Sequence, residues 1–240
     1  MNHIKQIAEK LPEYGLDAML ITSEPGEFYA VGFQGEGVAL VAQSGSWYFT
    51  DSRYIEAARN EVTLARVSQP VKGTNYRKMA EELVQAHGWK TVGFEENYMT
   101  VSAHQQWKDG LSAELKLASV LLENLRASKD AEEVEAMIAA QRIAERALEE
   151  TLAFLKPGRT EKEVAAYLEY KMISFGAEKK SFDTIVASGP NSSMPHAVPG
   201  DRKIQKGDFV TIDFGCKVCG YCSDTTRTVA VGEPTEEMRK

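Results

Sequence analysis

Residues 211–231, TIDFGCKVCGYCSDTTRTVAV, combine two kinds of side chain that bind metal ions. All three cysteines of the chain, Cys216, Cys219 and Cys222, lie within this segment, and two aspartates, Asp213 and Asp224, flank them. Thiolates suit zinc or an iron–sulfur cluster, whereas carboxylates suit hard cations such as Mn²⁺ or Mg²⁺. A thiol site would need four ligands, and the chain has no fourth cysteine.

The geometry of a hairpin makes the two kinds of site alternatives. If the turn holds an even number of residues, Asp213 and Asp224 share a face of the hairpin, and Cys216 and Cys222 point to opposite faces. If the turn holds an odd number of residues, Cys216 and Cys222 share a face and the two aspartates point to opposite faces. Cys219-Gly220 supplies a glycine for a two-residue turn, the commonest hairpin connection, and so favours the aspartate pair. On spacing alone, two solvent-facing aspartates that bind no metal remain an alternative.

The rest of the chain supplies the elements that must position these residues. Over residues 1–120 short apolar runs alternate with helical patterns, which predicts an α/β domain with a mostly parallel or mixed sheet. Single strands are expected over 17–22, 63–68 and 91–96. A hairpin is expected over 37–50, with its turn at Ser44-Gly45. The expected helices cover 2–14, 75–87 and 101–108.

The pattern changes near Leu125, so we expect one domain over 1–124 and a second over 125–240. Ser128 can cap a long helix whose predicted inner face contains Val134, Met137, Ile138, Gln141, Ala144, Leu148, Leu152 and Leu155. Thr160 and Glu163 form a capping box for a second helix, with Val164, Leu168 and Met172 on one face. A strand over 182–188 follows, and a new helix is predicted to begin at Thr235.

Composition excludes several function classes. The net charge is −7, so no basic surface for nucleic acid or for an anionic membrane is expected. No apolar stretch approaches the roughly 18–20 residues that span a bilayer, and the N-terminus lacks the apolar run of a signal peptide. The clustered cysteines do not form a disulfide framework. We therefore expect a cytoplasmic protein.

Longer stretches resemble a known family. FDTIVASGPNSSMPHAVPGDRKIQKGDFVTIDFG (182–215) and GYCSDTTRTVAVGEPT (220–235) are similar to the pita-bread metallopeptidases, which include creatinase, methionine aminopeptidase, Xaa-Pro aminopeptidase and Xaa-Pro dipeptidase (prolidase). The proline-specific members are the most similar. GEFYAVGF (26–33), TDSRYIEAA (50–58) and LRASKDAEEVEAM (125–137) match their order of elements. The resemblance implies a creatinase-like α/β N-terminal domain, ribonuclease-H-like, followed by an incomplete α+β pita-bread catalytic domain.

The resemblance also implies roles for individual residues. Asp213 and Asp224 match two aspartates that hold two divalent metal ions, for which Mn is expected and Co or Zn are possible. His196 matches a catalytic, substrate-binding histidine, although Ala197 stands where the family usually has Gly. Asp51, Arg53 and Tyr54 match an N-terminal motif, to which we assign a structural role such as an ion pair.

The implied activity is hydrolysis of the Xaa-Pro bond at the N-terminus of peptides, by two metal ions that activate a bridging water. The net charge argues against nucleic-acid and membrane partners. Family members commonly pair as dimers, so a peptide with proline in second position and a second copy of the chain are the expected partners. The remaining ligands, one His and two Glu, have no match before Lys240, so these 240 residues alone are expected to be inactive. The alternative is a pseudo-peptidase that binds peptides or proteins without catalysis.

Overall fold

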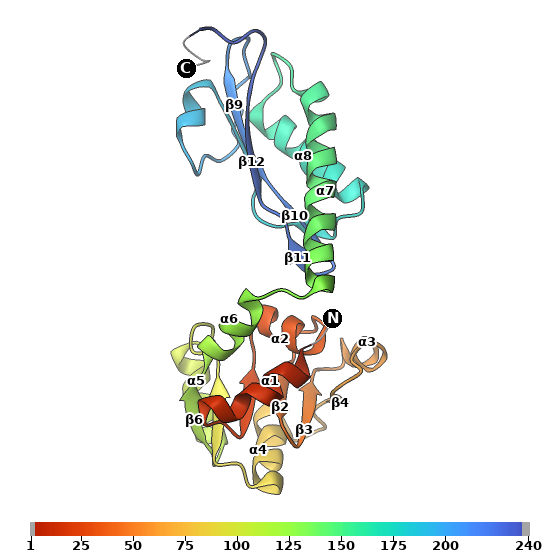
Figure 1. Cartoon of the computed structure of the whole chain (residues 1–240), viewed down its shortest axis with the longest axis vertical. Coiled ribbons are helices and arrows are strands. Elements are labelled where there is room, and N and C mark those ends of the chain that lie inside the picture. The colour runs from red at the N-terminus through yellow and green to blue at the C-terminus, as the bar shows by residue number, and fades with distance from the viewer. Residues whose placement is uncertain (1–2, 237–240) are drawn as a thin grey trace. The chain divides into compact units, whose positions relative to one another are not determined.

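The chain divides after Lys129 into two compact units. The structure is a computed structural model that describes residues 3–236 (Figure 1). Leu125, near which the sequence places a boundary, lies within helix α6 (Ser119–Ala127), the last helix of the first unit. The helix predicted to begin at Thr235 would extend over residues 237–240, which lie outside the described residues. No helix in the described range is long and apolar enough to cross a membrane.

The first unit is built around a six-stranded sheet (Figure 1). In spatial order its strands are β4 (Arg66–Ser68), β3 (Gly45–Phe49), β2 (Val38–Ala42), β1 (Ala18–Ile21), β5 (Thr91–Phe94) and β6 (Glu114–Leu117). Strands β1, β2 and β3 pair antiparallel, whereas β4, β5 and β6 join their neighbours in parallel. The predicted mixed sheet is confirmed, and the predicted hairpin is present with its turn at Gln43-Ser44, one residue earlier than expected.

Helices bury both faces of this sheet. Along β1, Met19 and Ile21 point into one core, and Ala18 and Leu20 point into the other. Helices α1 (Ile4–Lys10), α2 (Glu24–Val31), α3 (Ile55–Glu61) and α6 contribute to the first core, and α4 (Tyr76–His87) and α5 (Val101–Gly110) to the second. A 3₁₀ helix, η1 (Leu11–Tyr14), follows α1. A sheet covered on both sides needs consecutive apolar residues, which explains the runs AMLI and VALVA.

The second unit packs two helices against antiparallel strands (Figure 1). The helices are α7 (Ala131–Phe154) and α8 (Glu161–Ser174). One sheet has the order β12 (Thr225–Ala230), β9 (Phe209–Phe214), β8 (Ile185–Ser188), and the other β11 (Tyr221–Cys222), β10 (Cys216–Val218), β7 (Lys179–Lys180). A 3₁₀ helix, η2 (Gly189–Ser193), follows β8. The predicted capping box of Thr160 and Glu163 is confirmed, as is the buried face of Val164, Leu168 and Met172.

The predicted start of α7 is wrong, and its predicted inner face is correct only in part, since Ala144, Leu148 and Leu155 contact the core but the other large apolar residues do not. Asp130 caps α7 and forms the capping box with Glu133, whereas Ser128 ends α6. The buried face of α7 consists mainly of small residues: Ala136, Ala140, Ala144, Ala147 and Thr151. Of the predicted inner residues, Val134, Met137, Ile138 and Leu152 are exposed by 38% or more.

The reason for this difference is the close approach of α7 to β10 and β11. The Sγ atom of Cys216 lies 3.2 Å from the carbonyl oxygen of Ala140, a distance that a larger side chain on this helix face would prevent. Hydrophobicity alone would favour the larger apolar residues for the inner face, but the short distance between helix and sheet selects alanine.

Candidate metal and substrate site

The hairpin between β9 and β12 has the register that an even turn predicts. Asp213 pairs with Thr226, and Lys217 pairs with Cys222, so the positions sum to 439 along the whole ladder. The turn is Cys219-Gly220, and both residues have positive φ, 47° and 81°. Asp224 therefore lies one diagonal from Asp213 on the same face of the hairpin. The expectation that the two aspartates share a face is confirmed.

The same register separates the cysteines. Cys216 is buried in the core beneath α7, whereas Cys219 and Cys222 are exposed. Burial raises the pKa of the Cys216 thiol, which disfavours the thiolate that a metal requires. In the described part of the chain the three sulfur atoms do not lie within ligating distance of one another. The thiol alternative is therefore not supported by the geometry.

Asp213 and Asp224 lie on the face of the sheet opposite the core. Ile212 and Phe214, the neighbours of Asp213, are fully buried in the core against the helices, and Ser223 and Thr225, the neighbours of Asp224, are also buried. Asp213 is half-buried and Asp224 is exposed. Between them, Gly215 allows the strands to approach closely, because a Cβ atom there would collide with the carbonyl oxygen of Ser223.

The environment of Asp213 fits a cation. Its Oδ1 atom is buried and has no hydrogen-bond partner among the described residues. A buried carboxylate oxygen without a donor is unfavourable unless a proton or a metal ion compensates it. Asp224 makes no hydrogen bond or ion pair within residues 3–236 and supplies a second hard oxygen donor on the same face. This donor set fits a divalent cation such as Mn²⁺.

His196 lies in the segment between β8 and β9, beside a cavity of about 560 Å³. The imidazole is exposed and makes no hydrogen bond or ion pair with any described residue, the two aspartates included. The lining of the cavity is mostly apolar but also contains charged residues, and it includes Ala165, Phe182, Ile185, Val198, Lys162 and Lys180. Ile185 is also the neighbour of Asp213 across β8 and β9, so the cavity adjoins the strand that carries this aspartate.

A partly buried ion pair lies just after the segment that carries His196. The guanidinium of Arg202 donates to both carboxylate oxygens of Asp208, at 2.6 and 3.0 Å, and to the hydroxyl of Ser188 at the end of β8. Arg202 holds the pKa of Asp208 below its usual value, and the Gln205 N–H acts in the same direction, although burial opposes them. Sequence reasoning did not identify this pair: both residues lie in the 182–215 stretch, but the resemblance assigned neither of them a role.

This pair predicts an acid-sensitive contribution to stability. Because folding depresses the pKa of Asp208, its contribution is complete above its unfolded value near 3.8 and decreases as the pH falls through the folded value. Asp208→Asn should lower the free energy of unfolding by about 2 kcal/mol at pH 7, and the difference should shrink at pH 3. Urea unfolding at both pH values measures it. Asp201→Asn, which removes an exposed partner of Lys162, is the matched control, and equal losses at both pH values would contradict the prediction.

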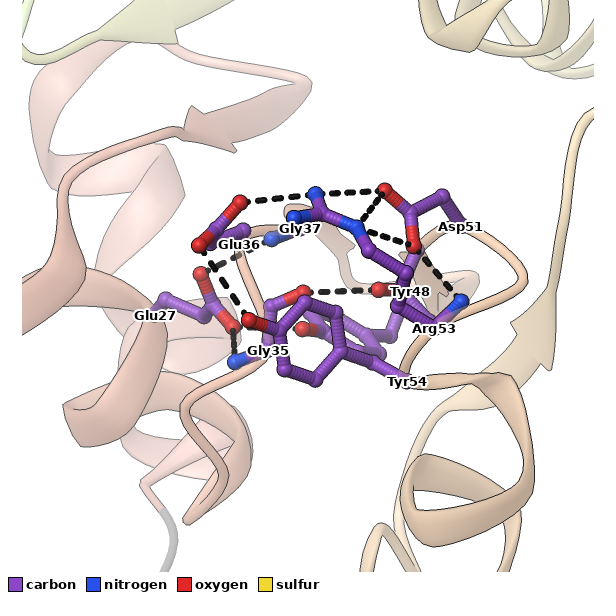
Figure 2. A network of polar contacts seen from close by, with 9 residues as sticks. Glu27, Gly35, Glu36, Gly37, Tyr48, Asp51, Arg53 and Tyr54 are labelled. Atoms are coloured by element: carbon purple, nitrogen blue, oxygen red, sulfur yellow. Dashed lines mark hydrogen bonds and ion pairs between the residues drawn. The ribbon is translucent and has the colours of Figure 1, made fainter.

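In the first unit, Asp51 and Arg53 form the expected ion pair. Arg53 donates to both carboxylate oxygens of Asp51 and, at 2.7 Å, to Glu36 (Figure 2). The hydroxyl of Tyr54 donates to the other oxygen of Glu36. Hydrogen bonds from Arg53 lower the pKa of Asp51, but this cluster is exposed, so the structural interpretation rests on geometry and not on a large energy.

Beneath that cluster lies a buried carboxylate that the sequence analysis missed. Glu27 is 3% exposed and accepts hydrogen bonds from the N–H groups of Gly35 and Gly37 and from the Tyr48 hydroxyl (Figure 2). Gly37 lies so close to Tyr48 that a Cβ atom would collide with the phenol. Burial and the contact with Glu27 raise the pKa of Tyr48, so the phenol remains a hydrogen-bond donor.

Two family models match the chain, one in each of its two units. Residues 3–128 match the model of the creatinase/prolidase N-terminal domain, and residues 135–240 match metallopeptidase family M24. The uncharacterized peptidase YqhT of Bacillus subtilis is 39% identical, over 99% of this chain and 67% of that protein.

Two solved structures are also similar. The Xaa-Pro dipeptidase from Bacillus anthracis superposes with a TM-score of 0.92 at 37% identity, over 98% of this chain and 66% of that one. The X-Pro aminopeptidase from Thermotoga maritima gives a TM-score of 0.89 at 33% identity, over 99% of this chain and 67% of that one. The chain thus spans about two thirds of the length of these relatives.

Proposed function

The chain belongs to metallopeptidase family M24 and carries the creatinase/prolidase N-terminal domain, and we propose that the protein hydrolyses the Xaa-Pro bond at the N-terminus of peptides. The observation that carries this proposal is the carboxylate pair: within residues 3–236, Asp213 has a buried Oδ1 without a hydrogen-bond partner, and Asp224 is a second unpaired carboxylate on the same face. The names of the Bacillus anthracis and Thermotoga maritima relatives support the Xaa-Pro specificity.

Asp213 and Asp224 would hold divalent metal, for which we propose two Mn²⁺ ions together with ligands from outside these 240 residues. Both side chains offer only oxygen atoms, which favours Mn²⁺ over metals that prefer thiolates. When bound, such ions polarise the scissile carbonyl and lower the pKa of water so that it can attack at neutral pH. Asp213 would contribute a ligand that needs little rearrangement, because the strand pairing already holds its backbone on both sides.

His196 would bind and orient the substrate. Its imidazole is free of partners in the described structure, so it can donate to or accept from a peptide backbone group that enters the adjoining cavity. The apolar lining residues of the cavity suit the side chain or proline ring of a short peptide, and the charged lining residues suit a peptide's termini. By analogy with the family, we also propose a cytoplasmic homodimer.

The test is hydrolysis of an Xaa-Pro dipeptide and of a longer Xaa-Pro peptide by the protein expressed from its complete reading frame. We expect cleavage after the first residue that is lost with a chelator and restored by added Mn²⁺. A matched Xaa-Ala peptide controls for proline specificity. Binding of the peptide without cleavage at any Mn²⁺ concentration would overturn the proposal in favour of a peptide-binding module. Comparison of the two proline substrates distinguishes a dipeptidase from an aminopeptidase.

A further inference from the structure

Glu161, the first residue of α8, is fully buried. Its Oε1 atom accepts hydrogen bonds from the Ser188 N–H at 2.7 Å, the Ser188 hydroxyl at 2.8 Å and the Asn191 side-chain amide at 3.0 Å. Its Oε2 atom accepts from the Gly200 N–H at 2.9 Å. One carboxylate thus receives four hydrogen bonds from a single stretch of chain that is distant in sequence.

These hydrogen bonds hold the two ends of the 188–200 segment against the same carboxylate. Ser188 ends β8 and Gly200 ends the segment that carries His196, so Glu161 binds the segment at both ends and, through Asn191, near its start. At the Gly200 end, a backbone hydrogen bond strengthens the attachment, because the Lys162 N–H donates to the Gly200 carbonyl at 3.1 Å. Holding both ends removes most of the conformational freedom that a loop of this length would otherwise keep.

The contacts require a carboxylate. An ionised carboxylate can accept at both oxygens and donates nothing, whereas an amide would turn a donor toward either Ser188 or Gly200. Burial alone would raise the pKa of Glu161, but the hydrogen bonds from Ser188, Asn191 and Gly200 outweigh it and keep the pKa below its usual value. The N-terminus of α8 also favours a negative charge at this position.

We propose that Glu161 is a positioning residue for His196: it fixes the 188–200 segment on α8 and thereby places the imidazole at the edge of the cavity. This inference rests on the proposed function, because it assigns Glu161 an effect on substrate through His196. Glu161 is not among the residues that line the cavity, and among the described residues its carboxylate bonds Ser188, Asn191 and Gly200 and not Asp213 or Asp224. Its effect should therefore be separable from metal binding.

The experiment compares Glu161→Gln with Glu163→Gln in the protein from the complete reading frame. Glu163 lies on the same turn of α8, but among the described residues its carboxylate bonds only Thr160 and Arg159, so its loss controls for charge and helix capping. We expect hydrogen exchange of residues 188–200 to rise at least about 10-fold in Glu161→Gln, with α8 and β9 unchanged, and to stay at the wild-type rate in Glu163→Gln. Exchange is measured without substrate, so this readout stands even if the protein does not cleave Xaa-Pro peptides.

A second readout separates positioning from general stabilisation. Glu161→Gln should lower kcat/KM for an Xaa-Pro peptide by about 10- to 100-fold, and the double variant with His196→Ala should lose no more than His196→Ala alone. The Mn²⁺ concentration for half-maximal activity should not change. Additive losses, or equal exchange in the two glutamine variants, would overturn the role of Glu161. An inactive wild type would instead overturn the proposed function, and the exchange comparison would still decide whether Glu161 orders the segment.

Discussion

Asp213→Asn should abolish Mn²⁺-dependent cleavage of Xaa-Pro peptides, with a loss of at least about 10³-fold, while leaving the metal-free fold intact. The reason is that the carboxylate has no other task in the described structure. Its Oδ1 atom is buried without a donor, so removing the charge also removes an unfavourable burial. Most core substitutions lower stability and activity together, but here we expect the two to separate.

The measurement has two parts. Thermal unfolding with and without MnCl₂ should show stabilisation of the wild type by the metal, about 2.7 kcal/mol at 100 times its Kd, and none in Asp213→Asn. The metal-free midpoint of the variant should equal or exceed that of the wild type. Asp109→Asn, at the end of α5 in the other unit, is the matched control and should keep both the metal effect and the activity. A variant that unfolds at a lower temperature without metal would show that Asp213 has a structural role instead.

The aspartate pair could be predicted because strand parity is a strict constraint. A two-residue turn at Cys219-Gly220 fixes the register of the hairpin, and in this register, which the structure shows, Asp213 and Asp224 share a face. The sequence did not reveal which face this is. That depends on where α7 and α8 pack, and Ile212 and Phe214 occupy the helix side.

The orientation of α7 could not be predicted for a related reason. The larger residues Val134, Met137 and Ile138 mark the more hydrophobic stripe, yet an alanine stripe faces the sheet. Amphipathicity measures which face avoids water, but it carries no information on how close the neighbouring strand lies. At a short separation only small residues fit, and steric exclusion overrides hydrophobicity.

Residues that act by hydrogen bonding over a long sequence distance were also missed. Glu161 stands inside the TEKE pattern that identifies a capping box, and its neighbour Glu163 performs that local function. The contacts of Glu161 join positions 27 to 39 residues away, which only the tertiary structure brings together. Glu27 is a second case, because a glutamate in the first turn of a helix is ordinarily an exposed residue.

Glu27→Ala should lower the free energy of unfolding of the first unit by about 3 to 4 kcal/mol. The substitution leaves three buried donors, the N–H groups of Gly35 and Gly37 and the hydroxyl of Tyr48, without an acceptor (Figure 2). Tyr48→Phe removes one donor and leaves the carboxylate with the two N–H groups, so its loss should be smaller, about 1 to 2 kcal/mol. A larger loss for Glu27→Ala than for Tyr48→Phe would show that the hydrogen bonds to the Glu27 carboxylate, and not only the burial of these side chains, stabilise the first unit.

Tryptophan fluorescence during urea unfolding measures these losses in the first unit selectively, since all three tryptophans, Trp47, Trp89 and Trp107, lie there. Glu56→Gln on α3 is the matched control: this glutamate is exposed, and its loss should change stability by less than about 0.5 kcal/mol. Hydrogen exchange should locate the damage in the Gly35–Gly37 loop, which also carries the Glu36 partner of Arg53. If Glu27→Ala and Glu56→Gln unfold alike, then the loop holds its position without the buried carboxylate, and its backbone N–H groups must reach water.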